Sequence, residues 1–393
     1  MTLRDDARAL SGDLVRLRRE IHADPEIGLR LPRTQQRVLA ALDGLPLEVK
    51  TGGALDSVTA VLRGGAPGPA VLLRGDMDAL PVVEKTGLPY ASSNGAMHAC
   101  GHDLHTAGLV GAARLLSARR ERLAGDVIFM FQPGEEGYDG AGQMIAEGVL
   151  EAAGDRPVAA YGVHVSTEHA SGMFHGRPGT LMAASATFDA TVHGAGGHGS
   201  RPHDAKDPVP VAAELITALQ TMVTRRFDVF DPVVVTVGRV RAGEAVNVIP
   251  DHASLGATVR AFSPEAMRRA EEEIGRVLAN VGRAHGVEVA LSFEPQYPAT
   301  VTDPAETAFA AGVVEEVFGS VRWEPLAVPK TGAEDFSRVL AEVPGTFVFL
   351  GAHDAATGPA ASNHSPLARF DDTVIADAAT LLAELAIRRL AAS

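Results

Sequence analysis

Hydrophobic positions recur along this chain with two different spacings. Over residues 3–21, leucine and isoleucine return every three or four positions between charged residues, at Leu10, Leu14, Leu17 and Ile21. That spacing predicts an amphipathic helix. Uninterrupted apolar runs, which predict buried strands, lie at 58–62, 70–73, 127–131 and 158–165. A Gly/Pro-rich stretch at 64–69 separates the first two runs, and we expect it to form a hairpin loop.

Helical patterns alternate with these strands. Residues 33–43 and 107–119 have the helical spacing, and we expect the second helix to begin beside Thr106, a residue type that favours helix N-caps. Later in the chain, 307–318 and 372–391 predict helices around a strand at 346–350. Continuous apolar strands that alternate with helices predict an α/β domain whose mainly parallel, doubly wound sheet is covered on both faces.

The pattern changes between about residues 181 and 294. Strands, helices and turns there follow the order β-α-β-β-α-β, with segments at 187–193, 208–223, 233–240, 253–262, 264–285 and 287–293. This is the order of the ferredoxin-like unit. We therefore predict two domains: a catalytic domain formed by 1–180 and 295–393, and an inserted α+β satellite domain formed by 181–294.

Composition narrows the function further. The chain has 393 residues, 46% of them hydrophobic, and a formal net charge of −14, which argues against general nucleic-acid binding. Its single cysteine excludes an intramolecular disulfide framework. The first residues do not resemble a signal peptide, and no apolar run is long enough to span a bilayer. We therefore expect a cytoplasmic protein without membrane partners.

The only cysteine, Cys100, lies two residues before His102 in a glycine-containing turn. A thiolate and an imidazole this close together are typical of the start of a metal site. The alternatives are that Cys100 is a buried apolar side chain, or that Cys100 and His102 form a nucleophilic pair. Metal binding would need further ligands from elsewhere in the chain.

Three other segments supply candidate ligands. Glu135 and Glu136 follow a predicted strand, flanked by glycines, and adjacent carboxylates repel unless a cation lies between them. His164 lies in another apolar strand, and His364 in a late loop. A solvated acidic loop, a core histidine and a surface histidine are the alternative interpretations. Cys100, His102, one of the two glutamates, His164 and His364 are more ligands than one tetrahedral site uses, so the sequence favours two divalent ions that share ligands. The other glutamate could then act as the base.

A glycine-rich segment, 194–199, matches the dinucleotide-binding pattern G-x-G-x-x-G. We discount that interpretation because no helix opens at its end and the surrounding unit is not β-α-β. The glycines are better explained as freeing the backbone to present His198.

Several long motifs, in order, resemble the M20 metallopeptidase family from end to end. They lie at 17–26, 74–81, 98–103, 131–137, 196–199, 247–250 and 334–336. Within the family, the chain is similar to the amidohydrolase subgroup of hippurate hydrolases, auxin–amino acid conjugate hydrolases and N-acyl-amino acid deacylases. One departure is Gly134, where many subgroup members have alanine. Another is an additional arginine, Arg201, which we expect to be solvated.

The resemblance implies a site built from named residues of this chain. The metal ligands would be Cys100, His102, Glu136, His164 and His364, with Cys100 bridging two ions where many relatives have aspartate. Glu135 would be the general base, and His198 would bind the substrate carbonyl or its oxyanion. Asn247 and Arg260 match positions associated with substrate binding. The family also implies a homodimer formed through the satellite domain.

The function that we predict is hydrolysis of N-acyl amino acids to a carboxylic acid and a free amino acid. A dipeptidase or aminopeptidase of the same family is the alternative enzyme, and a protein that keeps the fold but only binds ligands is the alternative without catalysis. Zn, Mn, Ni and Co all suit this mixture of thiolate, imidazole and carboxylate, so the metal stays open.

Overall fold

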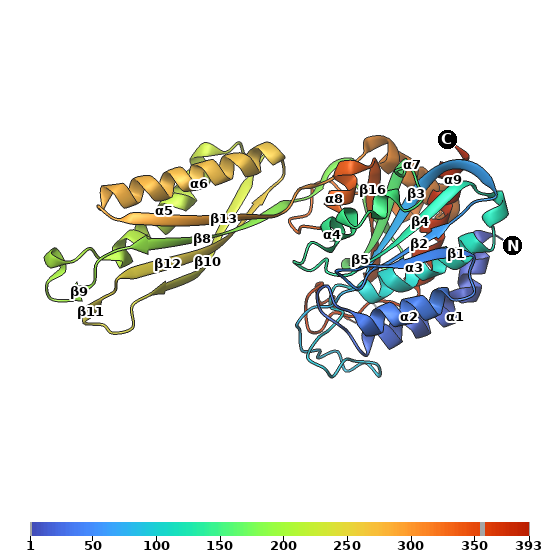
Figure 1. Ribbon diagram of the computed structural model, residues 1–393, viewed down its shortest axis with the longest axis horizontal. Coiled ribbons are helices and arrows are strands. Elements are labelled where there is room, and N and C mark those ends of the chain that lie inside the picture. Colours follow the sequence, from blue (N-terminus) through green and yellow to red (C-terminus); the bar gives the residue numbers. More distant parts are fainter. Residues whose placement is uncertain (1, 354–357, 393) are drawn as a thin grey trace. The chain divides into compact units, whose positions relative to one another are not determined.

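The structure, a computed structural model, describes residues 2–353 and 358–392 and divides into two compact units (Figure 1). The first unit comprises Met1–Leu181, Val301–Val328 and Asp335–Ser393, and the second comprises Met182–Thr300 and Pro329–Glu334. The sequence placed the second domain at 181–294. The short segment that returns to it is held by the backbone N–H of Ala183, which donates to the carbonyls of Lys330 and Gly332.

An eight-stranded sheet organises the first unit, in the order β1-β2-β4-β3-β5-β16-β6-β15. Its strands are β1 (Leu47–Thr51), β2 (Val58–Leu62), β3 (Ala66–Asp76), β4 (Ala124–Gln132), β5 (Ala159–Ala170), β6 (Phe174–Gly176), β15 (Trp323–Pro325) and β16 (Gly345–His353). The four central strands, β4, β3, β5 and β16, run parallel to their neighbours in this group. The predicted mainly parallel α/β fold is therefore confirmed.

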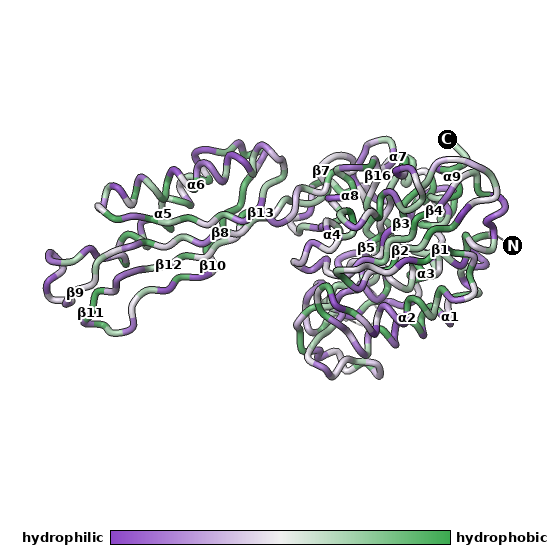
Figure 2. Tube along the Cα trace, viewed as in Figure 1, coloured by the Kyte–Doolittle hydropathy of each residue, from purple (hydrophilic) through white to green (hydrophobic). Residues whose placement is uncertain are grey.

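Helices cover this sheet because their apolar faces match its buried strands. They are α1 (Leu3–His22), α2 (Pro32–Leu42), α3 (His102–Ser117), α4 (Gly140–Ala146), α7 (Pro304–Phe318), α8 (Ser337–Glu342) and α9 (Val374–Ala391). Helices α1, α3 and α9 pack against one another, and α3 and α9 also contact β3. Hydrophobic residues gather along strands β3 and β4 and helix α9 in Figure 2. Leu73 belongs to the core under α3 and α9, whereas the next residue, Arg74, points to the opposite face and stacks on Phe336.

Two local expectations were wrong. Helix α3 begins at His102, not beside Thr106, because Gly101 takes a left-handed conformation with φ of 86° and ends the preceding turn. The stretch 64–69 is no hairpin loop, because β4 lies between β2 and β3 in the sheet and residues from Ala66 onward already belong to β3. The earlier start of α3 places His102 in its first turn.

The second unit is a four-stranded antiparallel sheet with order β10-β12-β8-β13. Its elements are β8 (Ala184–His193), β9 (Gly197–His198), α5 (Pro208–Arg226), β10 (Val233–Ala242), β11 (Val248–Ile249), β12 (His252–Ala261), α6 (Pro264–Ala284) and β13 (Glu288–Tyr297). Helices α5 and α6 pack on the sheet and on each other, around a separate core that includes Phe188, Leu215 and Ile274. The order of elements is the predicted ferredoxin-like one. Strands β7 (Gly179–Met182) and β14 (Thr300–Thr302) form a further short pair.

Candidate metal centre

Polar side chains collect where the central parallel strands of the first unit end. Asp76 is the last residue of β3, Glu135 follows β4 by three residues, and His164 lies in β5. Since the carboxyl ends of parallel strands lie at one edge of the sheet, these groups come together although they are far apart in sequence. The loop after β16 adds His364 at the same edge, and its backbone N–H donates to the carbonyl of Ala99 at 2.8 Å.

The structure brings the five predicted ligands into two clusters that share Cys100. One cluster is Cys100, His102 and His164, and the other is Cys100, Glu136 and His364; the ligand atoms of each lie within 4.8 Å of one another. Cys100 Sγ is 3.4 Å from His164 Nε2 and 3.2 Å from His364 Nε2. His364 Nε2 is 3.1 Å from Glu136 Oε1. One sulfur common to two three-residue sets is the arrangement that two neighbouring cations would need.

Two buried atoms of these clusters fit a metal ion. His102 Nε2 and Glu136 Oε1 are buried and make no hydrogen bond of regular geometry among the described residues, although Glu136 Oε1 lies 3.1 Å from His364 Nε2. A buried polar atom without a hydrogen bond is costly, and a cation bound at each cluster would supply the missing interaction. Thiolate, imidazole and carboxylate are also the donor types that bind divalent zinc and its neighbours.

Hydrogen bonds orient both buried histidines of the first cluster. His102 Nδ1–H donates to the carbonyl oxygen of Asp78 at 2.9 Å, and His164 Nδ1–H donates to the carbonyl oxygen of Val165 at 2.8 Å. In both rings the Nε2 lone pair is therefore the one that faces the cluster. Such bonds fix the tautomer of a metal-binding histidine and the direction of its ring.

The electrostatic field at the clusters favours positive charge. Hydrogen bonds to Cys100 and Glu136 raise the pKa of His364 to about 10, against the opposing effect of burial. Burial also opposes charge on His102, yet the Asp76 carboxylate and the bonds to Asp78 and Cys100 raise the pKa of His102 well above its usual range. Burial and the neighbouring His105 lower the pKa of His164. The anionic groups thus draw in protons that a divalent ion would replace.

Asp78 shapes the turn that carries the two glutamates. Its two carboxylate oxygens each accept a backbone N–H, from Glu135 and from Glu136, both at 3.0 Å. Glu135 is 6% exposed, and its Oε2 lies 3.9 Å from His102 Nε2. Gly134, just before it, has φ of 73°, and a Cβ there would lie 2.6 Å from Leu29 Cδ2, which explains the glycine at this position.

A second layer lies behind the clusters; the sequence indicated Asp76 as a polar candidate at a strand end but did not indicate its partners His105 and Arg74. His105 Nδ1–H donates to Asp76 Oδ1 at 2.6 Å, and His105 Nε2 accepts the backbone N–H of Val165 at 2.7 Å. Arg74, 1% exposed, donates to the other Asp76 oxygen at 2.6 Å. The signal was the position of Asp76 after an apolar strand; His105, three residues beyond His102, faces the same way along α3.

Gly101 gives a first prediction, on stability. A Cβ there would lie 2.3 Å from Val165 Cγ2 in a backbone region that disfavours alanine. Gly101→Ala should lower the free energy of unfolding of the metal-free protein by about 2–5 kcal/mol, since the left-handed conformation costs about 1–2 kcal/mol and overpacking about 1–3 kcal/mol. Urea denaturation of the metal-free natural protein and of the variant measures this difference in the free energy of unfolding.

Gly44→Ala is the matched control for this prediction. Gly44 has φ of 75°, but a Cβ there would meet nothing within 4 Å. Its alanine variant should therefore show only the conformational cost, about 1–2 kcal/mol. Equal losses for the two variants would show that the contact with Val165 is unimportant.

The remaining predicted site residues belong to the second unit. His198 lies in β9 and pairs with Val248 of β11. The backbone N–H of Ser200 donates to His198 Nδ1 at 3.1 Å, and the Ser200 hydroxyl lies 2.8 Å from the same nitrogen. Nδ1 is therefore an acceptor, and a neutral His198 carries its proton on Nε2. This leaves Nε2–H as a donor toward a ligand.

Asn247 and Arg260 lie on the same unit, and Asn247 supports the His198 turn. The Asn247 carbonyl accepts the backbone N–H of Gly199 at 2.8 Å. Arg260 of β12 is half-buried, its side chain makes no ion pair or hydrogen bond within the described part of the chain, and burial lowers its pKa. Arg201 instead donates to Asp204 at 2.6 Å on the surface, in agreement with the expected solvated position. The roles of these residues toward substrate stay predictions.

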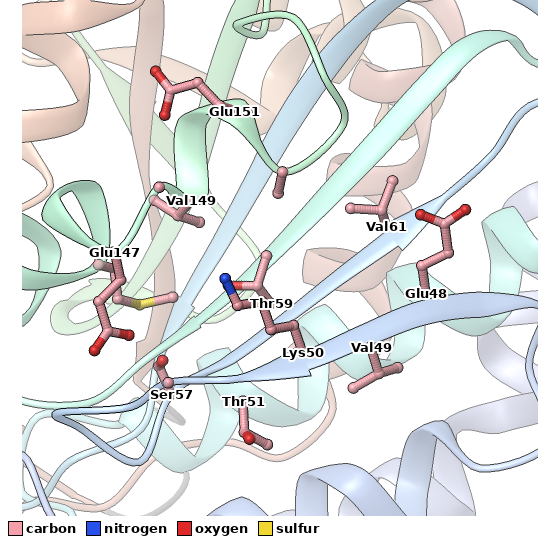
Figure 3. Close-up of a pocket in the computed structure, with 14 residues that line it drawn as sticks. Glu48, Val49, Lys50, Thr51, Ser57, Thr59, Val61, Glu147, Val149 and Glu151 are labelled. Carbon is pink, nitrogen blue, oxygen red and sulfur yellow. The ribbon is translucent and has the colours of Figure 1, made fainter.

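A separate hollow of about 440 Å³ lies between strands β1 and β2 and the segment 144–152 (Figure 3). Three glutamates line it, but each already has partners: Glu48 accepts from Arg63, Glu151 accepts from Arg156, and Glu147 accepts backbone N–H groups of 53 and 54. None of the clustered candidate ligands lines this hollow. It therefore adds nothing to the metal centre.

Comparison with known proteins places this chain in one family of peptidases and related hydrolases. Residues 72–388 match the model of peptidase family M20/M25/M40. The chain is 37% identical to IAA-amino acid hydrolase ILR1-like 5 of Arabidopsis thaliana, over 96% of this chain and 86% of that protein. It is 34% identical to N-acetyl-L-cysteine deacetylase of Bacillus subtilis, over 99% and 92%. Among the helices of the described ranges, none has the length and hydropathy needed to cross a bilayer.

A solved structure agrees with the fold. The chain superposes on a dinuclear metal-binding peptidase of the M20 family from Bacillus subtilis with a TM-score of 0.83 and 31% identity, over 98% of this chain and 99% of that one. That protein is described as binding two metals.

Proposed function

Because this chain belongs to peptidase family M20/M25/M40 and is a metal-dependent amidohydrolase, we propose that it cleaves the amide bond of N-acyl amino acids. The products are a carboxylic acid and a free amino acid. Two divalent ions per subunit would be held by the two clusters, with Zn, Mn, Ni and Co as the candidate metals.

One observation supports this proposal above the others: Cys100 belongs to both three-residue clusters, and Glu135 lies beside them. The ions, when bound, supply Lewis acidity, which polarises the amide carbonyl and makes water acidic enough to attack near neutral pH. Glu135 takes a proton from the attacking water and then gives it to the departing amine. Its neighbour Glu136 serves as a ligand, so the two carboxylates have different tasks.

The second unit would supply groups that recognise the substrate. His198 donates from Nε2–H to the oxygen of the amide carbonyl as negative charge develops there, because Ser200 keeps Nδ1 as an acceptor. Arg260 lacks a carboxylate partner of its own among the described residues, so it is suited to bind the free carboxylate of the amino-acid half. Asn247 supports the turn that presents His198.

Two of the relatives support an acyl-amino acid over an unblocked peptide, whereas two thermostable carboxypeptidases of Saccharolobus solfataricus, 35% and 34% identical to this chain, favour a peptide. Of the first two, one is named for deacetylation of N-acetyl-L-cysteine and the other for hydrolysis of IAA–amino acid conjugates. In each of these substrates the nitrogen of the amino acid is acylated. A peptidase acting on free dipeptides is the alternative, and the similar Bacillus subtilis structure, a peptidase, favours it.

The test is amine release from N-acetyl, N-benzoyl, long-chain N-acyl and indole-acyl amino acids beside unblocked dipeptides. The protein is stripped and reloaded in turn with Zn, Mn, Co or Ni. We expect release from blocked amino acids that a chelator abolishes. Release only from dipeptides would support the peptidase instead. Activity that resists chelators but is lost on alkylation would point to a Cys100–His102 nucleophile, and a folded protein silent with every metal would point to ligand binding alone.

We also propose a homodimer formed through the second unit, in the cytoplasm. Strand β10 is an edge strand of its sheet and carries Val234 and Val240 exposed. Such an edge readily pairs with another copy of the same strand. Sedimentation equilibrium should give a dimer for the natural chain and a monomer for Val240→Lys, since a lysine at a sheet edge blocks pairing. A natural chain that sediments as a monomer would contradict this proposal.

A further inference from the structure

Asn363 has no role in the mechanism proposed above, but its side chain forms hydrogen bonds beside the candidate metal ligands. Its side-chain oxygen accepts two hydrogen bonds from Thr167, one from the backbone N–H and one from the hydroxyl, both at 3.1 Å. Its side-chain nitrogen donates to the carbonyl of Val165 at 3.1 Å and to the carbonyl of Cys100 at 3.4 Å. The same nitrogen lies 3.8 Å from Cys100 Sγ. The amide thus joins the end of β5 to the Cys100 turn.

These contacts lie next to three of the five candidate ligands. Val165 follows His164, and its carbonyl also accepts the His164 Nδ1–H that sets the tautomer of that ring. Cys100 is the ligand that both clusters share. His364 is the residue directly after Asn363, so the amide anchors the loop that presents its ring.

His364 needs such an anchor for two reasons. Its φ is 70°, a left-handed conformation that a non-glycine residue adopts only when surrounding contacts hold it there. Its side chain is also 54% exposed, so packing does little to direct the ring toward Cys100. The bond from His364 N–H to Ala99 O and the side chain of Asn363 fix the backbone on either side of the ligand.

From this geometry we infer that Asn363 is a positioning residue for the second metal position, the one formed by Cys100, Glu136 and His364. The first position should depend on it less, because His102 is oriented by Asp78 and His164 keeps its own bond to the Val165 carbonyl, although that carbonyl also accepts from Asn363. The inference rests on the two-ion site of the proposed function. It predicts that loss of the amide N–H donor weakens metal binding at the second position more than at the first.

The test is a Co²⁺ titration of the stripped protein, followed by the visible absorption of the thiolate–cobalt bond, with bound metal counted by mass spectrometry. Asn363→Asp keeps the acceptor for Thr167 but removes the N–H donors. We expect the natural protein to bind two equivalents, and the variant to bind the first within about 3-fold of normal and the second at least ~10-fold more weakly. Asn280→Asp, an exposed change on α6 of the second unit, is the control and should bind as the natural protein does.

Circular dichroism checks that the variant is folded. If Asn363→Asp fails to fold, Asn363→Ala, which adds no charge, decides the question with the same expected weakening of the second equivalent. Two ions bound with unchanged affinity by either folded variant would overturn the role of Asn363 alone. A natural protein that takes up a single ion would overturn the two-ion proposal and this inference with it.

Discussion

Replacing Glu135 by glutamine should lower kcat at least ~100-fold while both metal ions stay bound. A positioned general base contributes roughly 10²- to 10⁴-fold to such reactions, and glutamine has the shape of glutamate but cannot take a proton. The backbone N–H of residue 135 would still donate to Asp78, so the turn that carries Glu136 should keep its conformation. Steady-state kinetics with the best substrate, together with metal content, measure both expectations.

Glu136→Gln is the matched control, since it changes the neighbouring carboxylate in the same turn. Both glutamates lie in a candidate group with His102, but only Glu136 also belongs to the cluster with Cys100 and His364. The control should therefore lose affinity for one ion, and the Glu135 variant should lose none. A near-normal rate for Glu135→Gln would remove Glu135 as the base, and loss of metal from it would make it a ligand instead.

Replacing Cys100 by alanine should weaken both metal positions at once and lower kcat/KM at least ~1,000-fold. The sulfur is the one atom that belongs to both three-residue sets, so its removal leaves two ligands for each ion. Metal ions contribute several kcal/mol of stabilisation to transition states of this kind, and each 1.36 kcal/mol corresponds to tenfold in rate. Metal titration and kinetics on the same preparation measure the effect.

Cys100→Asp distinguishes a bridging ligand from a nucleophile. A carboxylate can bridge two divalent ions, and aspartate is what many M20 relatives have at this position. The aspartate variant should therefore recover two-ion binding and part of the activity. If Cys100 attacked the substrate itself, the alanine and aspartate variants would be equally inactive, and alkylation of the natural enzyme would abolish activity without displacing metal.

Much of this protein followed from local patterns in the sequence. The strand at 58–62 and the helix that begins at residue 3 agree with the structure, because hydrophobic spacing reports directly which face of an element is buried. The β-α-β-β-α-β order predicted the ferredoxin-like unit, since short connections leave few ways to arrange six consecutive elements. Cys100, Glu136 and the histidines were recognisable because their residue types suit metals and they lie beside predicted strands.

Local patterns failed where a single backbone conformation or a distant strand decided the outcome. The start of α3 depends on the left-handed conformation of Gly101, which hydrophobic spacing does not report. The expected hairpin at 64–69 depended on β2 and β3 being neighbours, and strand β4, some sixty residues later in the chain, lies between them.

The sequence by itself therefore determined the elements, the two-unit organisation and the residue types of the site. The family resemblance implied that Cys100 is shared, but only the tertiary structure decided that Asp78 and Val165 orient the histidines and that Asn363 braces a strained His364. The physical reason is that spacing along a chain reflects contacts within a few residues. Which ligands share one sulfur depends instead on the order in which β4, β3, β5 and β16 lie in the sheet.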